Sequence, residues 1–263
     1  MIAAGCDVGS LTAKVVLLKN NKIKASAVTN VQGSPEAAAR AVMDNALATA
    51  GLSADDIQCC IGTGYGKKRL EFVEDTISEI ACHGKGAHWL VPEVRTVIDI
   101  GGQDCKAIKL DETGDIVNFM TNDKCAAGTG RFLEVMSNLL NVELDELGDL
   151  SEKSREVLHF SATCTIWVQQ EVIRHVHDDR AVEDIGAAVN RAMADRVAIL
   201  ANRLGVEEDL CMTGGVAKNI GVRKDVERLL GMKIRKIKID PQIMGALGAA
   251  IFAREKMEEQ DAA

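Results

Sequence analysis

Two stretches of the chain share one layout, Cys6-Asp7-Val8-Gly9-Ser10 and Asp99-Ile100-Gly101-Gly102-Gln103-Asp104. Each places an Asp-x-Gly turn after an apolar run, and a second apolar run, a polar turn and a third apolar run follow. This order predicts a three-stranded meander twice, over residues 2–28 and 96–120. The chain therefore carries an internal repeat.

Helices and strands alternate after each meander. Ser34-Pro35-Glu36 has the residues of an N-cap with proline at the first helical position, and it opens an Ala-rich stretch that we expect to be helical up to Gly51. A strand is expected next, at 57–61. In the second half, the apolar spacing predicts helices near 130–140, 164–177, 183–204, 218–230 and 244–258, and strands at 209–212 and 232–239.

A meander followed by alternating helix and strand predicts a mixed sheet covered by helices. Two such halves predict an α/β fold of two duplicated domains with a cleft between them. The boundary is expected at Val91-Pro92-Glu93, because Pro92 does not continue the preceding helical pattern and a new strand follows it. We therefore assign residues 1–92 to the first domain and 93–243 to the second, with a C-terminal helix at 244–260 that packs back on the first.

The composition describes a folded protein with an excess of acidic residues. The 263 residues are 47% hydrophobic, which is enough to fill real cores, and the formal net charge is −8. Nucleic acid and anionic membranes need clustered Lys and Arg, and base stacking needs more than the 3% of aromatic residues found here. We therefore expect no nucleic-acid partner and no membrane partner. Because no basic leader and no run of bilayer-spanning length occurs, we expect the protein in the cytoplasm.

The turns of the two meanders suit phosphate groups. A tight turn with Gly9 at its tip lets backbone N–H groups and the hydroxyls of Ser10 and Thr12 approach a phosphate closely. Lys14 adds a positive charge, and it lies seven residues after its leading Asp, as Lys106 does in the second meander. The pattern therefore predicts two phosphate hairpins.

Asp7 and Asp99, one at the end of each first strand, suit a hydrated Mg²⁺ or the attacking water. One Asp-x-Gly turn alone would mean little because such turns are common, but two in matching positions favour a nucleotide site. A third element, Met212-Thr213-Gly214-Gly215-Val216, ends an apolar strand and opens a helix, where glycines let the backbone approach a nucleotide. The sequence contains neither a P-loop string nor a Gly-x-Gly-x-x-Gly string.

These three elements resemble the phosphate 1, phosphate 2 and adenosine motifs of the superfamily that contains actin, heat-shock chaperones, sugar kinases and acetate kinase. The resemblance implies ribonuclease H-like, actin-like ATPase domains with ATP and Mg²⁺ between them. It implies catalytic roles for Asp7, Asp99, Gln103 and Asp104, with Gln103 or Asp104 near the attacking water. Gln242 is expected to border the adenosine with Gly214 and Gly215, and the full set implied for nucleotide binding is Gly9, Ser10, Leu11, Thr12, Ala13, Lys14, Gly101, Gly102, Gly128, Thr129, Gly130, Gly214, Gly215, Val216 and Gln242.

Longer strings resemble one branch of this superfamily, the activator or component A proteins of 2-hydroxyacyl-CoA dehydratases, which are ATPases of the BadF/BadG/BcrA/BcrD type. The resemblance covers nearly the whole chain. Its most specific strings are Val97-Ile98-Asp99-Ile100-Gly101-Gly102-Gln103-Asp104 and Asn122-Asp123-Lys124-Cys125-Ala126-Ala127-Gly128-Thr129-Gly130-Arg131-Phe132-Leu133. Residues 63–66, 161–165 and 245–250 also match.

Two of the eight cysteines lie in these strings. In the family, the Cys of Cys-Ala-Ala-Gly-Thr-Gly and the Cys of Ser-x-Thr-Cys-Thr ligate a 4Fe-4S cluster that two subunits share, and here they are Cys125 and Cys164. Both are expected at helix N-termini, whose dipoles favour an anionic thiolate cluster. Buried inert thiols are the simpler interpretation without the resemblance, and we keep it for Cys6, Cys59, Cys60, Cys82, Cys105 and Cys211.

Two thiolates are half of the set that a 4Fe-4S cluster normally takes, so the resemblance implies a homodimer with one shared cluster. It implies that ATP hydrolysis drives one-electron transfer from ferredoxin or flavodoxin to a CoA-ester dehydratase or reductase component. The segment Trp167-Val168-Gln169-Gln170-Glu171 departs from the Phe-Ala-Glu-Ser-Glu expected of dehydratase activators at this place. This departure keeps benzoyl-CoA reductase and a double-cubane iron–sulfur protein open as partners.

Two other classes of protein use the same fold. A small-molecule kinase would transfer phosphate to a sugar or a carboxylic acid, but 263 residues are few for a sugar kinase and that function has no use for Cys125 and Cys164. A nucleotide-dependent scaffold of the actin or chaperone kind would bind ATP and hold clients or polymerise, and it would contain no iron.

Overall fold

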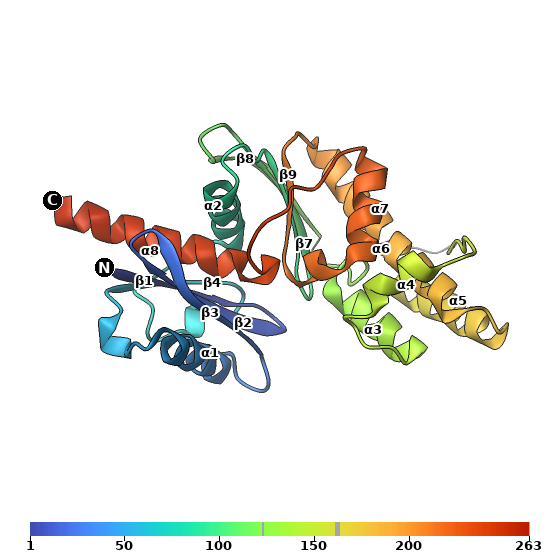
Figure 1. Ribbon diagram of the computed structural model, residues 1–263, viewed down its shortest axis with the longest axis horizontal. Helices are drawn as coiled ribbons and strands as arrows, with labels where there is room; N and C mark the ends of the chain where they lie inside the picture. Colours follow the sequence, from blue (N-terminus) through green and yellow to red (C-terminus); the bar gives the residue numbers. More distant parts are fainter. Residues whose placement is uncertain (123, 161–163, 263) are drawn as a thin grey trace. The chain divides into compact units, whose positions relative to one another are not determined.

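The chain divides into two units in the computed structural model, which describes residues 1–122, 124–160 and 164–262. The first unit comprises Met1–Val94, Leu110–Ile116 and Ile237–Ala263, and the second comprises Arg95–Lys109 and Val117–Lys236. Each unit contains a mixed β-sheet with helices packed on it (Figure 1). The α/β fold class predicted from the sequence is confirmed. The domain boundary at residue 92 and the nucleotide cleft stay predictions.

The sheet of the first unit has the strand order β3-β2-β1-β4-β5. Its first three strands form the predicted meander, with β1 antiparallel to β2 and β2 antiparallel to β3. The turn at Asn20 and Asn21 has φ angles of 47° and 62°, as a two-residue hairpin turn with a matching twist requires. The strands are β1 (Ile2–Val8), β2 (Thr12–Lys19), β3 (Lys22–Asn30), β4 (Cys59–Thr63) and β5 (Asp75–Thr76).

Alternate residues of β1 face two different helical layers. Ala4, Cys6 and Val8 belong to a buried cluster that includes α1 (Pro35–Ala50). On the other face, Gly5 lies so close to α8 (Met244–Ala262) that an added Cβ would fall 2.1 Å from a backbone oxygen of that helix. Figure 1 shows α1 and α8 on opposite sides of this sheet. Because side chains alternate along a strand, Asp7 points to the α8 side.

The ends of α1 agree with the prediction. Ser34 accepts a hydrogen bond from the N–H of Ala37, Pro35 occupies the first turn, and Gly51 closes the helix with a φ of 67°. The strand expected at 57–61 instead spans Cys59–Thr63, because residues Ala54–Asp56 form a 3-10 turn and β4 starts only after it. The unit is completed by α2 (Glu79–Leu90), which packs against α8, and by short 3-10 turns at Lys67–Arg69 and Pro241–Ile243.

The sheet of the second unit has the order β8-β7-β6-β9. The strands are β6 (Thr96–Ile100), β7 (Cys105–Leu110), β8 (Ile116–Asn122) and β9 (Leu210–Thr213), and β6 is antiparallel to β7 and parallel to β9. This is the second predicted meander joined by a later parallel strand. The helices are α3 (Gly130–Leu140), α4 (Leu147–Lys153), α5 (Thr165–His177), α6 (Val182–Leu204) and α7 (Ile220–Leu230), with a 3-10 turn at Gly215–Lys218.

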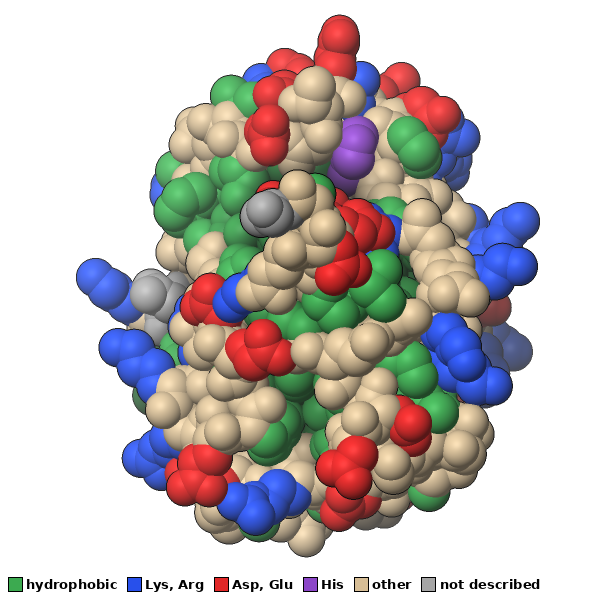
Figure 2. All heavy atoms as spheres, turned by 90° about the vertical axis from the view of Figure 1, so that its left-hand side faces the viewer, with side chains coloured by type: hydrophobic (Ala, Val, Ile, Leu, Met, Phe, Trp, Pro, Cys, Tyr) green, Lys and Arg blue, Asp and Glu red, His purple; other side chains and the backbone are tan. Residues whose placement is uncertain are grey.

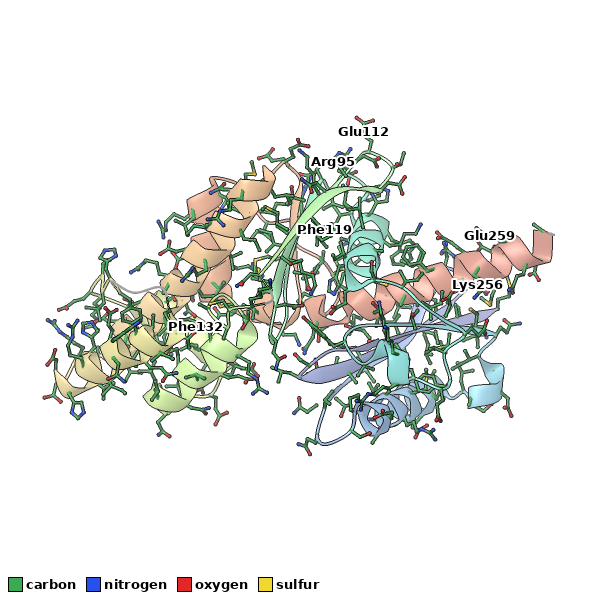
Figure 3. All side chains as sticks on the ribbon, turned by 180° about the vertical axis from the view of Figure 1, so that it is seen from behind. Arg95, Glu112, Phe119, Phe132, Lys256 and Glu259 are labelled. Atoms are coloured by element: carbon green, nitrogen blue, oxygen red, sulfur yellow. The ribbon has the colours of Figure 1, made fainter. Side chains whose placement is uncertain are left out.

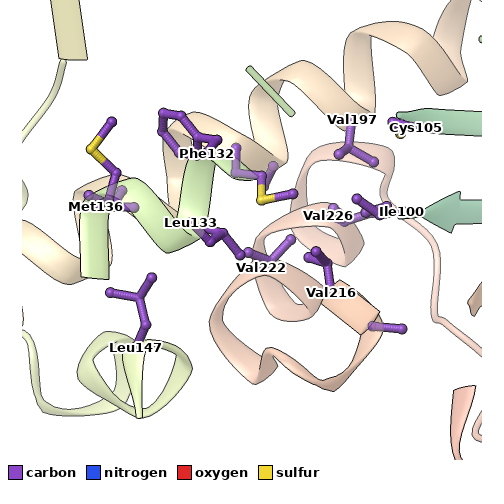
Figure 4. Packing of buried hydrophobic residues seen from close by; sticks show 14 of the residues in the cluster. Ile100, Cys105, Phe132, Leu133, Met136, Leu147, Val197, Val216, Val222 and Val226 are labelled. Carbon is purple, nitrogen blue, oxygen red and sulfur yellow. The ribbon is translucent and has the colours of Figure 1, made fainter. Parts of the chain in front are cut away.

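One face of β6 supplies the core of the second unit. Ile98 and Ile100 pack in a buried cluster with residues of α3, α6 and α7, among them Leu133, Val197 and Val222 (Figure 4). Asp99 lies between the two isoleucines and therefore faces away from this cluster. Two aromatic residues of the unit differ in burial: Phe132 on α3 is buried, whereas Phe119 on the edge strand β8 is 48% exposed (Figure 3).

Elements of the second unit also differ from the sequence prediction. The strand expected at 232–239 is not formed; in the described chain Ile234 makes only an isolated bridge to Leu210. The alternation of isoleucine with lysine and arginine in this segment is typical of a strand. The segment, however, forms one parallel bridge to β9 and enters the first unit at Ile237. The helix α4 was not predicted.

The surface of the protein carries charges of both signs. Acidic and basic side chains are interspersed on the face shown in Figure 2, so that face does not present one concentrated field. Among the described residues, no helix is both long and apolar enough to cross a membrane.

Candidate functional site

The first phosphate hairpin joins β1 to β2. The N–H of Gly9 donates to the carbonyl of Thr12 at 3.0 Å and closes the turn. The strand register places Asp7 opposite Lys14, and Lys14 Nζ donates to Asp7 Oδ2 at 3.1 Å. The spacing of seven residues between the leading Asp and its Lys therefore has a structural cause, since it sets the two side chains opposite each other across the hairpin.

The tip of this hairpin is partly accessible. Gly9, Ser10, Leu11 and Thr12 are half-buried, whereas Ala13 is completely buried. The side chain of Ala13 packs in the core, so only its backbone is placed to meet a ligand. The hydroxyls and backbone N–H groups of the tip are of the kind that bind a phosphate.

Asp7 is 2% exposed, and its Oδ1 has no hydrogen-bond partner in the described part of the chain. That oxygen lies against Gly64, since an added Cβ there would fall 2.6 Å from it. Asp7 Oδ2 and His83 Nε2 each lie 2.9 Å from the position of a Cβ on Gly245, so a larger residue there would displace one of these side chains. A buried carboxylate oxygen without a donor is costly, and a hydrated cation would satisfy it.

Gln242 lies beside the first hairpin. Its Nε2 donates to Thr12 Oγ1 at 3.3 Å, and its backbone N–H donates to Asp240 Oδ1 at 2.9 Å. Gln242 thus contacts Thr12 within the first unit, and Gly214 and Gly215 belong to the second unit. The adenosine contact expected of Gln242 stays a prediction.

The second phosphate hairpin joins β6 to β7 and repeats the first. The N–H of Gly101 donates to the carbonyl of Asp104 at 3.0 Å, and Asp99 lies opposite Lys106 in the register. Lys106 Nζ contacts Asp104 Oδ2 at 2.6 Å and Asp99 Oδ2 at 3.5 Å. All three charged side chains are buried. Two carboxylates and one ammonium give this trio a formal charge of −1 when all three groups are ionised.

Gln103 and Asp104 were alternatives for the residue near the attacking water. Gln103 is exposed at the tip of the hairpin, whereas Asp104 is buried and bound to Lys106. The exposed amide is free to meet a ligand from solvent, and the carboxylate is held within the hairpin.

The third turn follows β9 and lies next to Asp99. Thr213 Oγ1 donates to Asp99 Oδ1 at 3.0 Å. Gly214 has a φ of 84°, and an added Cβ would fall 2.3 Å from the carbonyl oxygen of Ile100, so no other residue fits there. Val216 is 7% exposed and packs in the core (Figure 4), so its backbone rather than its side chain is placed for a nucleotide.

The start of α3 is hydrogen-bonded to the second hairpin. The N–H groups of Gly130 and Arg131 donate to the carbonyls of Gly101 and Gly102 at 2.8 and 2.9 Å. These bonds satisfy N–H groups that the first turn of a helix leaves without partners. Thr129 is completely buried. The nucleotide contact predicted for residues 128–130 stays a prediction, and the bonds observed there are internal.

The eight cysteines fall into two groups. Cys125 and Cys164 are exposed, and the other six are buried. Cys164 is the N-cap of α5, as expected, but Cys125 lies in the loop before α3, whose N-cap is Thr129. The prediction that both cysteines lie at helix N-termini is therefore wrong for Cys125. Asp123 and residues 161–163, which belong to the same strings, lie outside the described residues.

Burial suppresses thiolate formation at the six inner cysteines. It raises the pKa of Cys60, Cys82 and Cys211 to about 12 and that of Cys59 to about 11. A thiolate is the form that ligates a metal. The two exposed cysteines are thus the chemically accessible pair.

The family model that matches residues 4–253 is that of the BadF/BadG/BcrA/BcrD ATPase family. The chain belongs to this family. It is 44% identical over 261 residues to the activator of lactoyl-CoA dehydratase from Anaerotignum propionicum, with 99% of this chain and 100% of that protein covered. It is 40% identical over 259 residues to the 2-hydroxyisocaproyl-CoA dehydratase activator of Clostridioides difficile, with 98% and 97% covered.

A solved structure of the activator of the 2-hydroxyisocaproyl-CoA dehydratase from Clostridium difficile, with bound ADPNP, is similar over 100% of this chain and 98% of that chain. The TM-score is 0.95 at 40% identity. A ROK family glucokinase from Streptomyces griseus shares the fold alone, with a TM-score of 0.56 at 13% identity over 97% of this chain and 100% of that chain. These likenesses agree with an actin-like ATPase fold.

Sequence reasoning missed two residues of these sites. His83 was not assigned to a site, yet its Nε2 lies as close to the position of a Cβ on Gly245 as Asp7 Oδ2 does. Asn122 was quoted only as the first residue of a matching string, yet its side chain holds the Cys125 loop. The neighbours of His83 are distant in the sequence, so no local pattern indicates them. The partners of Asn122 are only three and five residues away, but the bonds depend on the shape of an irregular loop that no pattern specifies.

Proposed function

We propose that this chain is a homodimeric iron–sulfur ATPase that couples ATP hydrolysis to one-electron reduction of a 2-hydroxyacyl-CoA dehydratase. The observation that carries this proposal is the division of the cysteines. Of eight thiols in one chain, only Cys125 and Cys164, the two in the strings that resemble cluster ligands, are exposed. In a protein whose cysteines served only for packing, there would be no reason for the exposed ones to be these two.

A shared cluster agrees with the number of ligands. Within the described ranges, His, Cys, Asp and Glu form no group of three or more that could hold a metal alone. A 4Fe-4S cluster normally takes four thiolates, so two from each of two copies complete it. When bound, such a cluster supplies a one-electron carrier of low potential.

Residues of both hairpins are proposed to bind ATP. We assign phosphate binding to the hydroxyls of Ser10 and Thr12, to Lys14, and to the backbone of Gly101 and Gly102. The wider nucleotide set keeps Gly9, Leu11, Ala13, Gly214, Gly215 and the backbone of Val216. Gln242 acts through Thr12, whose hydroxyl it contacts.

The environments of Asp7 and Asp99 favour different roles for these two residues. Asp7 has a buried oxygen without a donor in the described chain, so we assign it to the hydrated Mg²⁺. Asp99 already accepts from Thr213 and lies 3.5 Å from Lys106, so it is suited to orient the attacking water together with the exposed Gln103. In this arrangement Lys106 and Asp104 hold Asp99 in place.

A short path joins the phosphate hairpin to the cysteine loop. Gly101 and Gly102 bind the first N–H groups of α3, and the loop that ends at this helix contains Cys125. A shift of the second hairpin on nucleotide binding or hydrolysis therefore moves the start of α3. We propose that this movement is what couples ATP hydrolysis to electron transfer.

The electron is proposed to come from reduced ferredoxin or flavodoxin and to pass to the dehydratase component, while ATP and water become ADP and phosphate. A 2-hydroxyacyl-CoA dehydratase is favoured over benzoyl-CoA reductase and over a double-cubane protein by full-length relatives that are named as activators of such dehydratases. The exposed Trp167, where the family resemblance leads one to expect Phe, marks the surface at which the partner can differ.

Iron and sulfide analysis of anaerobically purified protein tests the proposal. We expect about two iron atoms per chain in the wild type and loss of the iron in Cys125→Ser and Cys164→Ser. Cys211→Ala serves as the control, because Cys211 is buried, and it should keep its iron. Iron-free protein after reconstitution would contradict the cluster and favour a scaffold or a kinase; phosphate transfer to a sugar or carboxylic acid would identify the kinase.

A further inference from the structure

An amide side chain binds two carbonyls of the loop between β8 and α3, which contains Cys125. Asn122 is the last residue of β8, and its Nδ2 donates to the carbonyl of Cys125 at 3.2 Å and to the carbonyl of Ala127 at 2.9 Å. A single –NH₂ group thus binds the backbone on both sides of Ala126. The two bonds fix the curvature of the described residues 124–129, which form neither helix nor strand.

The remaining carbonyl of this turn is bound from the other end. Thr129 donates to the carbonyl of Ala126 through its backbone N–H at 3.1 Å and through Oγ1 at 2.7 Å. Gly128 turns the chain with a φ of 86°, and an added Cβ would meet Arg196 of α6 at 3.1 Å. The carbonyls of three successive residues, 125, 126 and 127, are therefore all bound inside the loop.

From this geometry we infer that Asn122 is a positioning residue for the Cys125 thiol. It holds the loop in one shape before any metal is bound, so that the exposed thiol is presented in a fixed place. The inference rests on the proposed function, because the position of Cys125 matters for catalysis only if its thiol ligates the cluster. A ligand shared between two copies gains most from such preorganisation, since neither copy holds the cluster alone.

The chemistry of the side chain explains why the residue is Asn. Two carbonyl oxygens must be met by two N–H donors on one short planar group, and the carboxamide of Asn has them. Asp has the same shape but only acceptors when ionised, so it would set an oxygen against the carbonyls of Cys125 and Ala127. Ala removes both donors without adding a charge.

The first measurement is amide hydrogen exchange of the reduced, metal-free protein. Asn122→Ala and Asn122→Asp should exchange about 10-fold faster or more than the wild type in the peptide over residues 124–132, because each hydrogen bond stabilises by about 1 kcal/mol. The controls are Asn118→Ala and Asn118→Asp, which make the same changes at an exposed position of the same strand. Exchange in α6, which is well buried, reports in the same spectra whether each variant is folded.

The second measurement is the rate at which the loaded dimer loses iron to a chelator. We expect both Asn122 variants to lose iron about 10- to 100-fold faster, the usual effect of removing a group that orients a metal ligand. The Asn118 variants should match the wild type. Because Ala and Asp act alike in this prediction, a change seen only with Asp would be an effect of charge and would contradict positioning.

The outcomes separate the inference from the function on which it rests. Unchanged exchange of the loop in Asn122→Ala would overturn the role of Asn122 whether or not the protein binds iron. Faster exchange with an unchanged rate of iron loss would show that Asn122 stabilises the loop without positioning the ligand. This result would also overturn the inference. Wild-type protein without iron would remove the proposed function and the positioning role with it, while the exchange data would still report on the loop.

Discussion

Single residues distinguish two hairpins that look alike in sequence. Each has an Asp opposite a Lys across the first two strands. In the first hairpin Lys14 Nζ donates to Asp7 Oδ2, and Asp7 Oδ1 lacks a donor in the described chain. In the second hairpin, Lys106 Nζ lies 2.6 Å from Asp104 Oδ2 and 3.5 Å from Asp99 Oδ2. The repeat was visible in the sequence, but this difference depends on side-chain contacts that only folding creates.

Replacing Asp7 by Asn should weaken the use of Mg²⁺. Because Asn keeps the shape and removes the charge, the Mg²⁺ concentration that gives half-maximal ATPase activity should rise about 10- to 100-fold. Titration of ATPase activity with Mg²⁺ measures this. Gln58→Glu, away from the hairpins, is a charge-changing control, and an unchanged Mg²⁺ requirement in Asp7→Asn would remove Asp7 from the metal site.

Replacing Asp99 by Asn should lower ATP turnover with little loss of fold. Orientation of an attacking water by a carboxylate is worth about 100-fold or more in rate, and Asn still accepts a hydrogen bond from Thr213. The measurement is steady-state ATP hydrolysis with circular dichroism as the check on folding. Wild-type turnover in this variant would contradict the catalytic role of Asp99.

Replacing Lys106 by Met should destabilise the protein. The side chain is 5% exposed and lies between two buried carboxylates, which would be left without their cation. Breaking a buried ion pair from one side costs about 3–5 kcal/mol in the free energy of unfolding. Urea unfolding measures this loss, with the exposed Lys224→Met as the control that should lie within about 0.5 kcal/mol of the wild type.

At the scale of elements, the sequence predicted most helices and strands and failed where a contact decides the structure. The caps of α1 are local, so Ser34, Pro35 and Gly51 were sufficient to place it. The alternation at 232–239 was also local, but a strand needs a continuous partner and Ile234 found only one bridge. The two hairpins could be predicted from the repeat, and Cys125 and Cys164 could be singled out from their motifs. The contact of Gln242 could not be predicted because Thr12 lies far away in the sequence, and the contacts of Asn122 could not because they depend on the shape of an irregular loop.

One buried amide joins three helical elements of the second unit. Asn190 of α6 is completely buried, and its Nδ2 donates to the carbonyl of Leu147 and to Ser151 Oγ, both of α4, at 2.8 Å each. Its Oδ1 accepts from Asn219, the N-cap of α7, at 3.0 Å. Asn190→Leu should therefore lower the free energy of unfolding by about 2–4 kcal/mol, because several buried groups lose their partners. Urea unfolding measures it, and a loss below 0.5 kcal/mol would show that this network is not important for stability.

A buried carboxylate makes the same unit sensitive to acid. Hydrogen bonds from the backbone N–H groups of Glu156 and Arg155 hold the pKa of Asp184 below its usual value. Because the folded state prefers the ionised form, the stabilisation is complete above the unfolded pKa of about 4 and is lost as the pH falls through the lower folded value. Asp184→Asn should thus be less stable than the wild type at pH 7, and the difference should shrink below about pH 4. Urea unfolding at several pH values checks this; a difference independent of pH would contradict it.

In the whole molecule, the proposed function joins ATP hydrolysis to an accessible pair of thiols. The second unit contains one phosphate hairpin, the start of α3 bonded to it, and both exposed cysteines. The first unit contributes the other hairpin with Asp7 and Lys14. In the proposed function, a second copy adds the two thiolates that one chain lacks.

The most direct test of the account is electron transfer to a purified 2-hydroxyacyl-CoA dehydratase component under strictly anaerobic conditions. The reduced dimer is mixed with the dehydratase and with ATP, ADP or a non-hydrolysable ATP analogue, and the dehydratase reduced by one electron is quantified by electron paramagnetic resonance. We expect the dehydratase to be reduced with ATP, together with release of phosphate, and to be reduced little with ADP or with the analogue. Equal reduction with ADP and ATP, or ATP hydrolysis with no electron delivered to any such dehydratase, would contradict it.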